Sequence, residues 1–235
     1  MPSPTPRKLP GLLIAFLAMV SVLAIWASFH YDDTVRAAVV AAQDKGWKKS
    51  DESNFYFMVR RYGDWPWLMA AGAAGLILAW KLKSREWSQI IVAALVASTL
   101  SGIIANASRL TTGRTRPKES PKIAAGFYGP WKDSKLTIGQ SAYNSFPSGH
   151  TATAFGFAGP VFYGNPWLGV AALILAGLIG WSSIVTGNHH PSDVVVSIVL
   201  SMVVSWFVYR WIQQHGPKGW LWLRWKLKHA PRWIR

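Results

Sequence analysis

Apolar residues of the chain lie in long blocks that are nearly free of charge, and polar residues gather between these blocks. A soluble amphipathic helix would instead carry an apolar stripe beside a polar face. The first block, residues 11–29, contains no charged residue, and as a helix it extends roughly 29 Å, the thickness of a bilayer's hydrocarbon core. Five further blocks follow, at about residues 65–82, 87–107, 147–163, 167–185 and 194–212. The pattern predicts an all-α fold, a bundle of six transmembrane helices in a single integral membrane domain covering residues 1–235.

A secretory signal peptide is the alternative interpretation of the first block, because Arg7 and Lys8 precede it. The apolar run is longer than the usual core of a signal peptide, and residues 27–29 form a poor cleavage site. We therefore expect a retained membrane span. Two long loops are expected, at residues 29–64 and 108–146, the first with a short interfacial helix around residues 34–44.

Basic residues in the short flanks of the spans orient the chain. Six spans place both termini on the same side of the membrane. The basic residues that flank the spans on that side are Arg7, Lys8, Lys81, Lys83, Arg85 and Arg210. By the positive-inside rule, both termini are expected in the cytoplasm of a cell with an inner membrane. The loops at residues 109–150 and 186–193 then face the periplasm or the exterior.

A formal net charge of +15 could indicate a nucleic-acid-binding protein. The distribution of the charge argues against this, because residues 213–235 interleave Trp and Leu with Lys and Arg. That pattern is typical of a segment that lies on an anionic membrane surface. We therefore expect the bilayer as the partner, with 213–235 as an interfacial tail, and no nucleic acid. The oligomeric state stays open.

The first polar cluster lies at the end of the third predicted span and contains Arg109, Arg114 and Arg116. Any one of these side chains could simply reach up to lipid headgroups. Three arginines within eight residues, around Gly113, instead resemble a binding site for a dianion, because guanidinium groups match phosphate oxygens in pairs.

The second cluster is Pro147–His150, at the start of the fourth predicted span. Free N–H groups at a helix start attract anions, and Ser148 and Gly149 leave room for one to approach. An ordinary helix cap explains these two residues but leaves His150 unexplained. An ionisable residue at the mouth of a membrane helix is a candidate functional group.

The third cluster contains His189 and Asp193, four residues apart just before the last span. Asp193 could be an acid that merely favours a helix start. Beside His189 it could also accept a hydrogen bond from one imidazole nitrogen and leave the other as a nucleophile.

Together the three clusters resemble the signature of the type 2 phosphatidic acid phosphatase (PAP2) superfamily, in its membrane-embedded lipid phosphatase branch. The matching motifs are Arg109-x6-Arg116-Pro117, Pro147-Ser148-Gly149-His150 and Ser182-x6-His189-x3-Asp193. Their order, internal spacing and position at span ends agree with the family, and the six-span plan covers nearly the whole chain.

The resemblance implies a role for each matching residue. His189 would attack phosphorus to form a phosphohistidine, Asp193 would orient it, and His150 would protonate the leaving group. The phosphate would be held by Arg109, Arg116, Ser148 and Gly149. Neither a metal nor another cofactor is implied.

Two positions depart from the family pattern. Arg109 stands where the family usually has Lys. Arginine keeps the positive charge and adds a hydrogen-bond donor. Ser183 stands where the third motif usually has Arg, so one phosphate ligand is missing. We expect Arg114 to take over this role, with Lys118 and Lys122 as the other candidates.

The expected activity is hydrolysis of a phosphate monoester or a pyrophosphate on a membrane amphiphile at the outer face of the inner membrane. An isoprenyl pyrophosphate, a phosphatidylglycerol phosphate and a lipid A phosphate all fit as substrates. Two alternatives stay open: a phosphotransferase that passes the phosphate to another lipid, and a non-catalytic member that only binds lipid phosphate.

Overall fold

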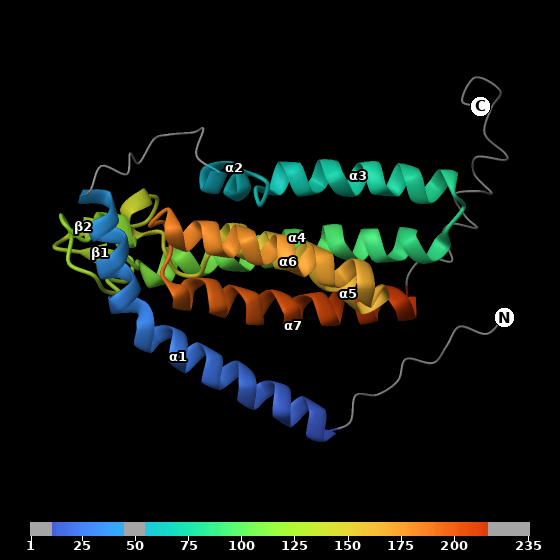
Figure 1. Cartoon of the computed structure of the whole chain (residues 1–235), viewed down its shortest axis with the longest axis horizontal. Helices are drawn as coiled ribbons and strands as arrows, with labels where there is room; N and C mark the ends of the chain where they lie inside the picture. The colour runs from blue at the N-terminus through green and yellow to red at the C-terminus, as the bar shows by residue number, and fades with distance from the viewer. Residues whose placement is uncertain (1–10, 45–54, 216–235) are drawn as a thin grey trace.

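The computed structural model describes residues 11–44 and 55–215 (Figure 1). Its α-helices are α1 (Gly11–Asp44), α2 (Phe55–Arg61), α3 (Trp65–Lys81), α4 (Arg85–Thr112), α5 (Gly149–Gly164), α6 (Pro166–Val185) and α7 (Pro191–His215). Between α4 and α5 lie two 3₁₀ turns, Pro117–Glu119 and Ser141–Tyr143, and a small antiparallel hairpin of β1 (Trp131–Lys132) and β2 (Lys135–Leu136). The protein is mostly helical, as predicted.

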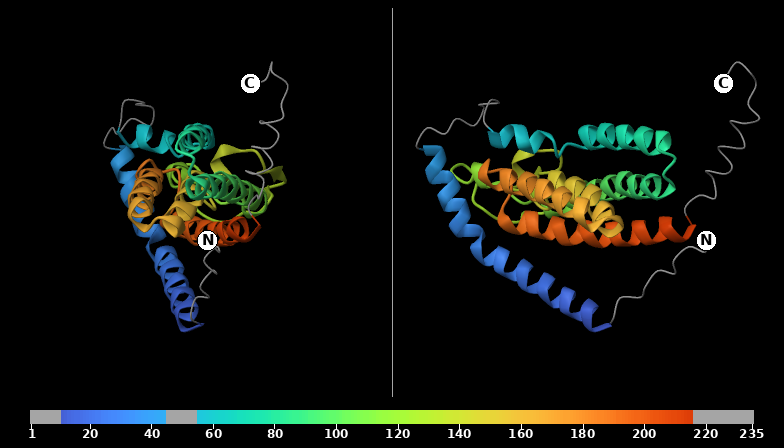
Figure 2. Two further views of the ribbon diagram at one scale, coloured as in Figure 1. Left: turned by 90° about the vertical axis from the view of Figure 1, so that its right-hand side faces the viewer. Right: turned by 45° about the vertical axis from the view of Figure 1, so that its right-hand side comes forward.

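Helices α4 to α7 pack side by side along the long axis of the molecule, and α3 lies against α4 (Figures 1 and 2). Small residues allow close packing inside this group. A Cβ added at Gly156 of α5 would lie 2.8 Å from the Ala97 carbonyl oxygen and from Ser98 Cα of α4. Serine hydroxyls join the same helices, since Ser98 Oγ donates to the Thr153 carbonyl at 2.9 Å and Ser201 Oγ to the Ala152 carbonyl at 3.0 Å.

Four of the helices in the described ranges, α1, α4, α6 and α7, are long and apolar enough to cross a membrane. The two other predicted spans form apolar helices at the expected places, but α3 has 17 residues and α5 has 16. The start of α5 is Gly149, two residues later than expected. The structure therefore supports a helical membrane protein with four candidate spans, and the count of six stays a prediction.

The expected loop with a separate helix at residues 34–44 is wrong, because α1 is one continuous helix of 34 residues that changes direction along its length (Figure 1). Residues 12–44 contain neither Gly nor Pro to end a helix. The polar residues that suggested a loop have partners instead. Arg36 pairs with Asp33 at 2.9 Å, and Asp32 is buried against residues from two other parts of the chain.

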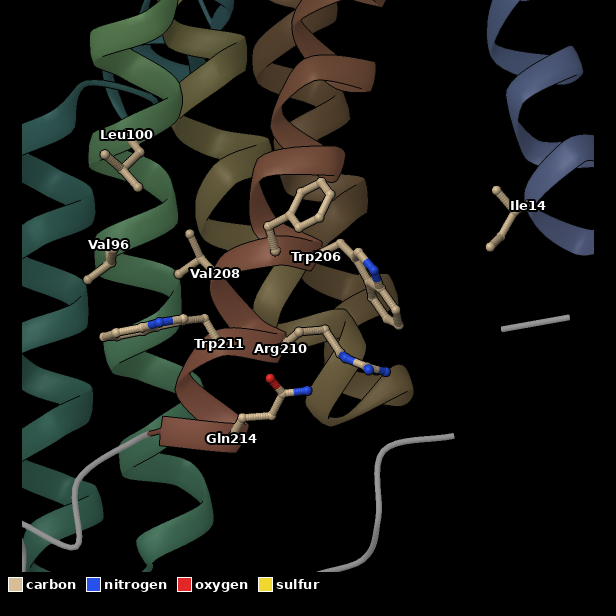
Figure 3. Close-up of a pocket in the computed structure, with 9 residues that line it drawn as sticks. Ile14, Val96, Leu100, Trp206, Val208, Arg210, Trp211 and Gln214 are labelled. Atoms are coloured by element: carbon tan, nitrogen blue, oxygen red, sulfur yellow. The ribbon is translucent and has the colours of Figure 1, made fainter. Parts of the chain in front are cut away.

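The first half of α1 leans away from the bundle, so its apolar side chains are exposed, and Trp26 keeps 68% of its surface (Figure 2). An open groove of about 910 Å³ lies between this part of α1 and helices α4 and α7. Figure 3 draws its lining side chains and labels all of them except Phe207: Ile14, Val96, Leu100, Trp206, Val208, Arg210, Trp211 and Gln214. The groove lies beside the C-terminal half of α7 and therefore far from the polar clusters at the start of that helix. The interfacial tail predicted at 213–235 lies almost wholly outside the described residues.

Candidate active site

The three polar clusters meet at one end of the helix bundle, where α4 ends and α5 and α7 begin (Figure 1). We call this the loop end, because residues 113–148 cover it. Arg109 Nε donates to the Pro147 carbonyl at 2.9 Å, which joins the first cluster to the second. The Ser148 N–H donates to the Asp193 carbonyl at 3.2 Å, which joins the second to the third. Residues far apart in the sequence therefore form one site.

His189 lies in the turn between α6 and α7 and is almost completely buried. Its Nδ1 lies 2.7 Å from the carbonyl oxygen of Ser145 and 3.6 Å from Asp193 Oδ2. A carbonyl can only accept, so Nδ1 carries the proton and Nε2 keeps its lone pair. Burial lowers the pKa of His189 to about 3, which leaves the ring neutral near pH 7. A buried neutral imidazole with a free Nε2 can act as a nucleophile.

Asp193 reaches His189 less directly than the sequence suggests. Its Oδ2 accepts hydrogen bonds from Ser145 Oγ at 2.5 Å and from the His190 N–H at 2.7 Å. The first donor belongs to Ser145, whose carbonyl oxygen also contacts the imidazole of His189. The second belongs to His190, the residue that follows His189. Asp193 thus holds the backbone around His189, and the Ser145 carbonyl is the direct acceptor. Ser145 was missed because its role depends on a carbonyl oxygen, which every residue has.

The prediction that Arg114 binds phosphate is corrected by its contacts. Its Nη1 lies 2.5 Å from Asp193 Oδ1 and its Nη2 lies 2.5 Å from Asp32 Oδ2 of α1. Nη1 also donates to Ser192 Oγ at 2.6 Å. The guanidinium is further enclosed by the rings of Phe29, Phe127 and Phe146. Arg114 therefore forms ion pairs with two buried carboxylates and helps to hold Asp193 in place. Its guanidinium has no free face for a phosphate.

Asp32 is a partner that the sequence analysis missed. It is 5% exposed, and its two oxygens accept from the Ser192 N–H at 3.0 Å and the Ser192 hydroxyl at 2.6 Å in addition to Arg114. The available signal was an acidic residue three positions after the end of the first apolar block. Nothing local in the sequence indicates that this acid meets the start of the last helix.

Arg109 and Arg116 supply the donors that remain open. Arg109 lies over the start of α5, where a Cβ at Gly149 would lie 2.9 Å from its Nη2. Within the part of the chain that the structure describes, Arg109 Nη2 and Arg116 Nε are buried and have no hydrogen-bond partner. An unpaired buried donor costs about 1–3 kcal/mol, more when it is charged. An anion between the two guanidinium groups would remove this cost.

Further cations lie beside Arg116. Its Nη1 donates to Asn188 Oδ1 at 3.1 Å, and Lys118 Nζ donates to the same oxygen at 2.8 Å. Burial, followed by the charge of Arg60 on α2, lowers the pKa of Arg116. Asn188 directly precedes His189, so this positive charge lies next to the candidate nucleophile. Arg60 was missed because it lies outside all three motifs.

The other two expected site residues are placed at the start of α5. Ser148 is fully buried, and its hydroxyl lies 2.8 Å from Thr151 Oγ1. His150 remains partly exposed, and its Nε2 lies 2.6 Å from Asp64 Oδ1 at the start of α3. Ser183, at the position of the expected arginine, is buried in α6 and donates to the Ile179 carbonyl at 2.9 Å.

Comparison with known proteins gives a consistent family. Residues 90–217 match the PAP2 superfamily. The lipid A 1-phosphatase of Porphyromonas gingivalis is 33% identical over 138 residues, which are 57% of this chain and 26% of that protein. The lipid A 1-phosphatase of Rhizobium johnstonii is 28% identical over 157 residues, 62% of this chain and 61% of that one. The chain therefore spans from about a quarter to about three fifths of the length of these relatives.

Two further similarities cover a shorter stretch or have a lower identity. The undecaprenyl-diphosphatase BcrC of Bacillus subtilis is 33% identical over 73 residues, which are 31% of this chain and 38% of that protein. Among solved structures, the crystal structure of Aquifex aeolicus LpxE shares 23% sequence identity, with a TM-score of 0.46 over 66% of this chain and 84% of that one.

Proposed function

The chain belongs to the PAP2 superfamily, and from this premise we propose that it is a lipid phosphatase that removes a phosphate from a membrane amphiphile. The observation that carries the proposal is the pair of buried, unpaired guanidinium donors, Arg109 Nη2 and Arg116 Nε, whose charges both act on the imidazole of His189. These donors match the oxygens of a phosphoryl group. The neutral imidazole supplies a nucleophile, which a protein that only binds phosphate does not need.

The proposed reaction has two steps. In the first, His189 Nε2 attacks phosphorus, the bond between phosphorus and the lipid oxygen breaks, and His150 gives a proton to that oxygen. In the second, water attacks the phosphorus of the phosphohistidine, the bond between phosphorus and Nε2 breaks, His150 takes up the water's proton, and inorganic phosphate leaves. Arg109, Arg116 and the N–H groups at the start of α5 neutralise the phosphoryl oxygens in both steps.

A sugar-linked phosphate of the lipid A type is the first substrate to test, because the P. gingivalis and R. johnstonii relatives carry the name lipid A 1-phosphatase. An isoprenyl pyrophosphate is the second, because the B. subtilis relative carries the name undecaprenyl-diphosphatase. Both substrates present a phosphoryl group on an oxygen that departs, and both bring it to the site from a bilayer.

We place the whole chain in the inner membrane as one domain, with α3 and α5 as additional spans and both termini in the cytoplasm. Helix α5 is short, but α4, α6 and α7 enclose it, so few of its backbone groups face lipid. Basic residues between α3 and α4 support this orientation. The loop end then faces the periplasm, where lipid headgroups reach it.

The test is phosphate release by the purified protein in detergent, with lipid A, undecaprenyl pyrophosphate and phosphatidylglycerol phosphate as separate substrates. Wild type is expected to release phosphate from at least one of them and to form an alkali-stable phosphoenzyme. His189→Asn is expected to lose both the release, by about a thousandfold or more, and the phosphoenzyme. Release that survives His189→Asn would contradict the mechanism. Binding of these lipids without release by the wild type would contradict the proposed function.

A further inference from the structure

Asp64 forms the shortest polar contact that the structure gives to His150. The Oδ1 of Asp64 lies 2.6 Å from His150 Nε2, although the two residues lie at the starts of different helices. Neither lies deep in the protein, since the side chains keep 45% and 24% of their surface. The contact is therefore partly open to solvent, whereas His189 and Asp193 are buried.

The position of Asp64 in the sequence suggests a different role, which the side chain does not perform. It is the N-cap residue of α3, where Asp is favoured because its carboxylate usually accepts an N–H of the first turn. Here the side chain makes no cap hydrogen bond. The carboxylate turns to the imidazole instead, so helix capping does not explain its orientation.

The backbone before Asp64 is fixed to α5 and α6. The carbonyl oxygen of Gly63 accepts a hydrogen bond from Thr153 Oγ1 at 2.7 Å. A Cβ at Gly63 would lie 2.5 Å from Ile179 Cγ2 and 3.4 Å from His150 Cβ, so a larger residue there would displace Ile179. These contacts place the junction of α2 and α3 against the start of α5, where Asp64 can reach His150.

The surrounding charges keep Asp64 ionised. The hydrogen bond with His150, followed by the charges of His150, Arg60 and Arg61, lowers the pKa of Asp64, although burial opposes this shift. The guanidinium of Arg109 lies over Gly149, the residue directly before His150. A carboxylate and a cation of the proposed phosphate site therefore both lie near His150.

We propose that Asp64 is a positioning residue for His150: it accepts the Nε2–H and thereby presents Nδ1 to the oxygen that leaves with the lipid. The proton on Nδ1 passes to this oxygen as its bond to phosphorus breaks, while the proton on Nε2 stays on the ring and bonded to Asp64. This inference rests on the proposed phosphatase function. The inference adds a second pair of histidine and aspartate to the site. His150 and Asp64 act in the protonation of the leaving oxygen, and His189 and Asp193 act in the attack on phosphorus.

The test compares Asp64→Asn with wild type on two substrates. For the lipid phosphate, kcat is expected to fall about tenfold or more with KM nearly unchanged, because the leaving oxygen needs a proton. The burst of p-nitrophenolate from p-nitrophenyl phosphate stays close to wild type, since this leaving group needs no proton. Asp64→Glu is expected to restore part of the lost activity.

Asp33→Asn is the matched control, because it makes the same change at an exposed carboxylate on α1 and is expected to leave both reactions unchanged. Equal losses on both substrates, or no loss on the lipid, would overturn the role of Asp64. Nitrogen-15 spectra of His150 give a readout that does not depend on activity. In wild type the proton should stay on Nε2, and in Asp64→Asn it should exchange between the two ring nitrogens. A spectrum that does not change contradicts the proposal. A wild type that forms no phosphoenzyme from either substrate overturns the phosphatase function instead.

Discussion

The imidazole of His189 is oriented by a backbone carbonyl, and the carboxylate of Asp193 acts one step further away. Asp193 receives donors from Ser145, His190 and Arg114, so its charge is shared among the groups that surround the ring. Loss of this carboxylate would therefore disturb the position of the ring as well as the electrostatic field at Nε2. In the proposed reaction, residues that hold Asp193 therefore influence catalysis without touching the phosphate.

Replacement of Arg114 tests whether residues that hold Asp193 are important, because its guanidinium is buried between the carboxylates of Asp32 and Asp193. Arg114→Met removes the charge at similar volume and leaves Asp32 and Asp193 facing one another. The protein should lose about 3–5 kcal/mol of stability and melt at a lower temperature in detergent. The double variant Asp32→Asn/Arg114→Met should lose less than the sum of the single losses, because each change removes the same pair. A raised KM with an unchanged melting temperature would instead favour the original assignment of Arg114 to the phosphate.

At the scale of the elements, close approach of α4 and α5 aligns the first cluster with the second. Gly156 lies where the two helices touch, and the nearest atoms to an added Cβ belong to the backbone of α4. Backbone atoms cannot turn aside as a flexible side chain can. The spacing of Arg109 from the start of α5 therefore depends on a small residue several turns away.

Gly156→Ala should force α4 and α5 apart and cost about 1–3 kcal/mol, measured as a lower melting temperature. It should also weaken inhibition by inorganic phosphate, because Arg109 moves away from Gly149. Gly177→Ala in α6 is the matched control, since nothing lies within 4 Å of its added Cβ. Alanine favours a helix over glycine by about 0.5–1 kcal/mol, so this variant should melt at the same or a higher temperature. Equal melting of the two variants would contradict the packing argument.

The elements also show what the sequence can and cannot predict. Apolar blocks indicate the places of six helices, and the motif spacings indicate the clusters, because both are local patterns. The partners Asp32, Asp64 and Ser145 escaped prediction because each meets its histidine or arginine only after distant segments pack. The continuity of α1 escaped prediction for the same reason. Its polar residues suggested a loop, because the partners of Asp32 lie in distant parts of the chain.

For the whole molecule, burial of the polar end makes stability depend on pH. The pKa of His189 is lowered to about 3, below its ordinary value of about 6.5. Between these values the unfolded chain binds a proton that the folded protein does not. The free energy of unfolding should therefore fall as the pH falls from 6.5 toward 3, by at most about 1.4 kcal/mol per pH unit from this residue.

Melting temperatures in detergent at pH 7, 6, 5 and 4 measure this effect. His189→Asn removes the titrating group and should show a smaller decrease between pH 6.5 and pH 4 than the wild type. Curves that fall in parallel would show that His189 does not lose a bound proton on folding. The comparison does not depend on activity, so it tests the burial of His189 separately from its proposed role as nucleophile.

The bond between Asp32 and Ser192 joins residues 160 positions apart. A ribosome delivers the first of these residues long before the second, so α1 is made well before α7 exists. Until then Arg114 has Asp32 as a partner but lacks Asp193, and His189 lacks its supporting carboxylate. The candidate site is thus completed only when α7 has been made. Under the proposed function, a chain stopped before α7 would carry His189 without Asp193 and would not release phosphate.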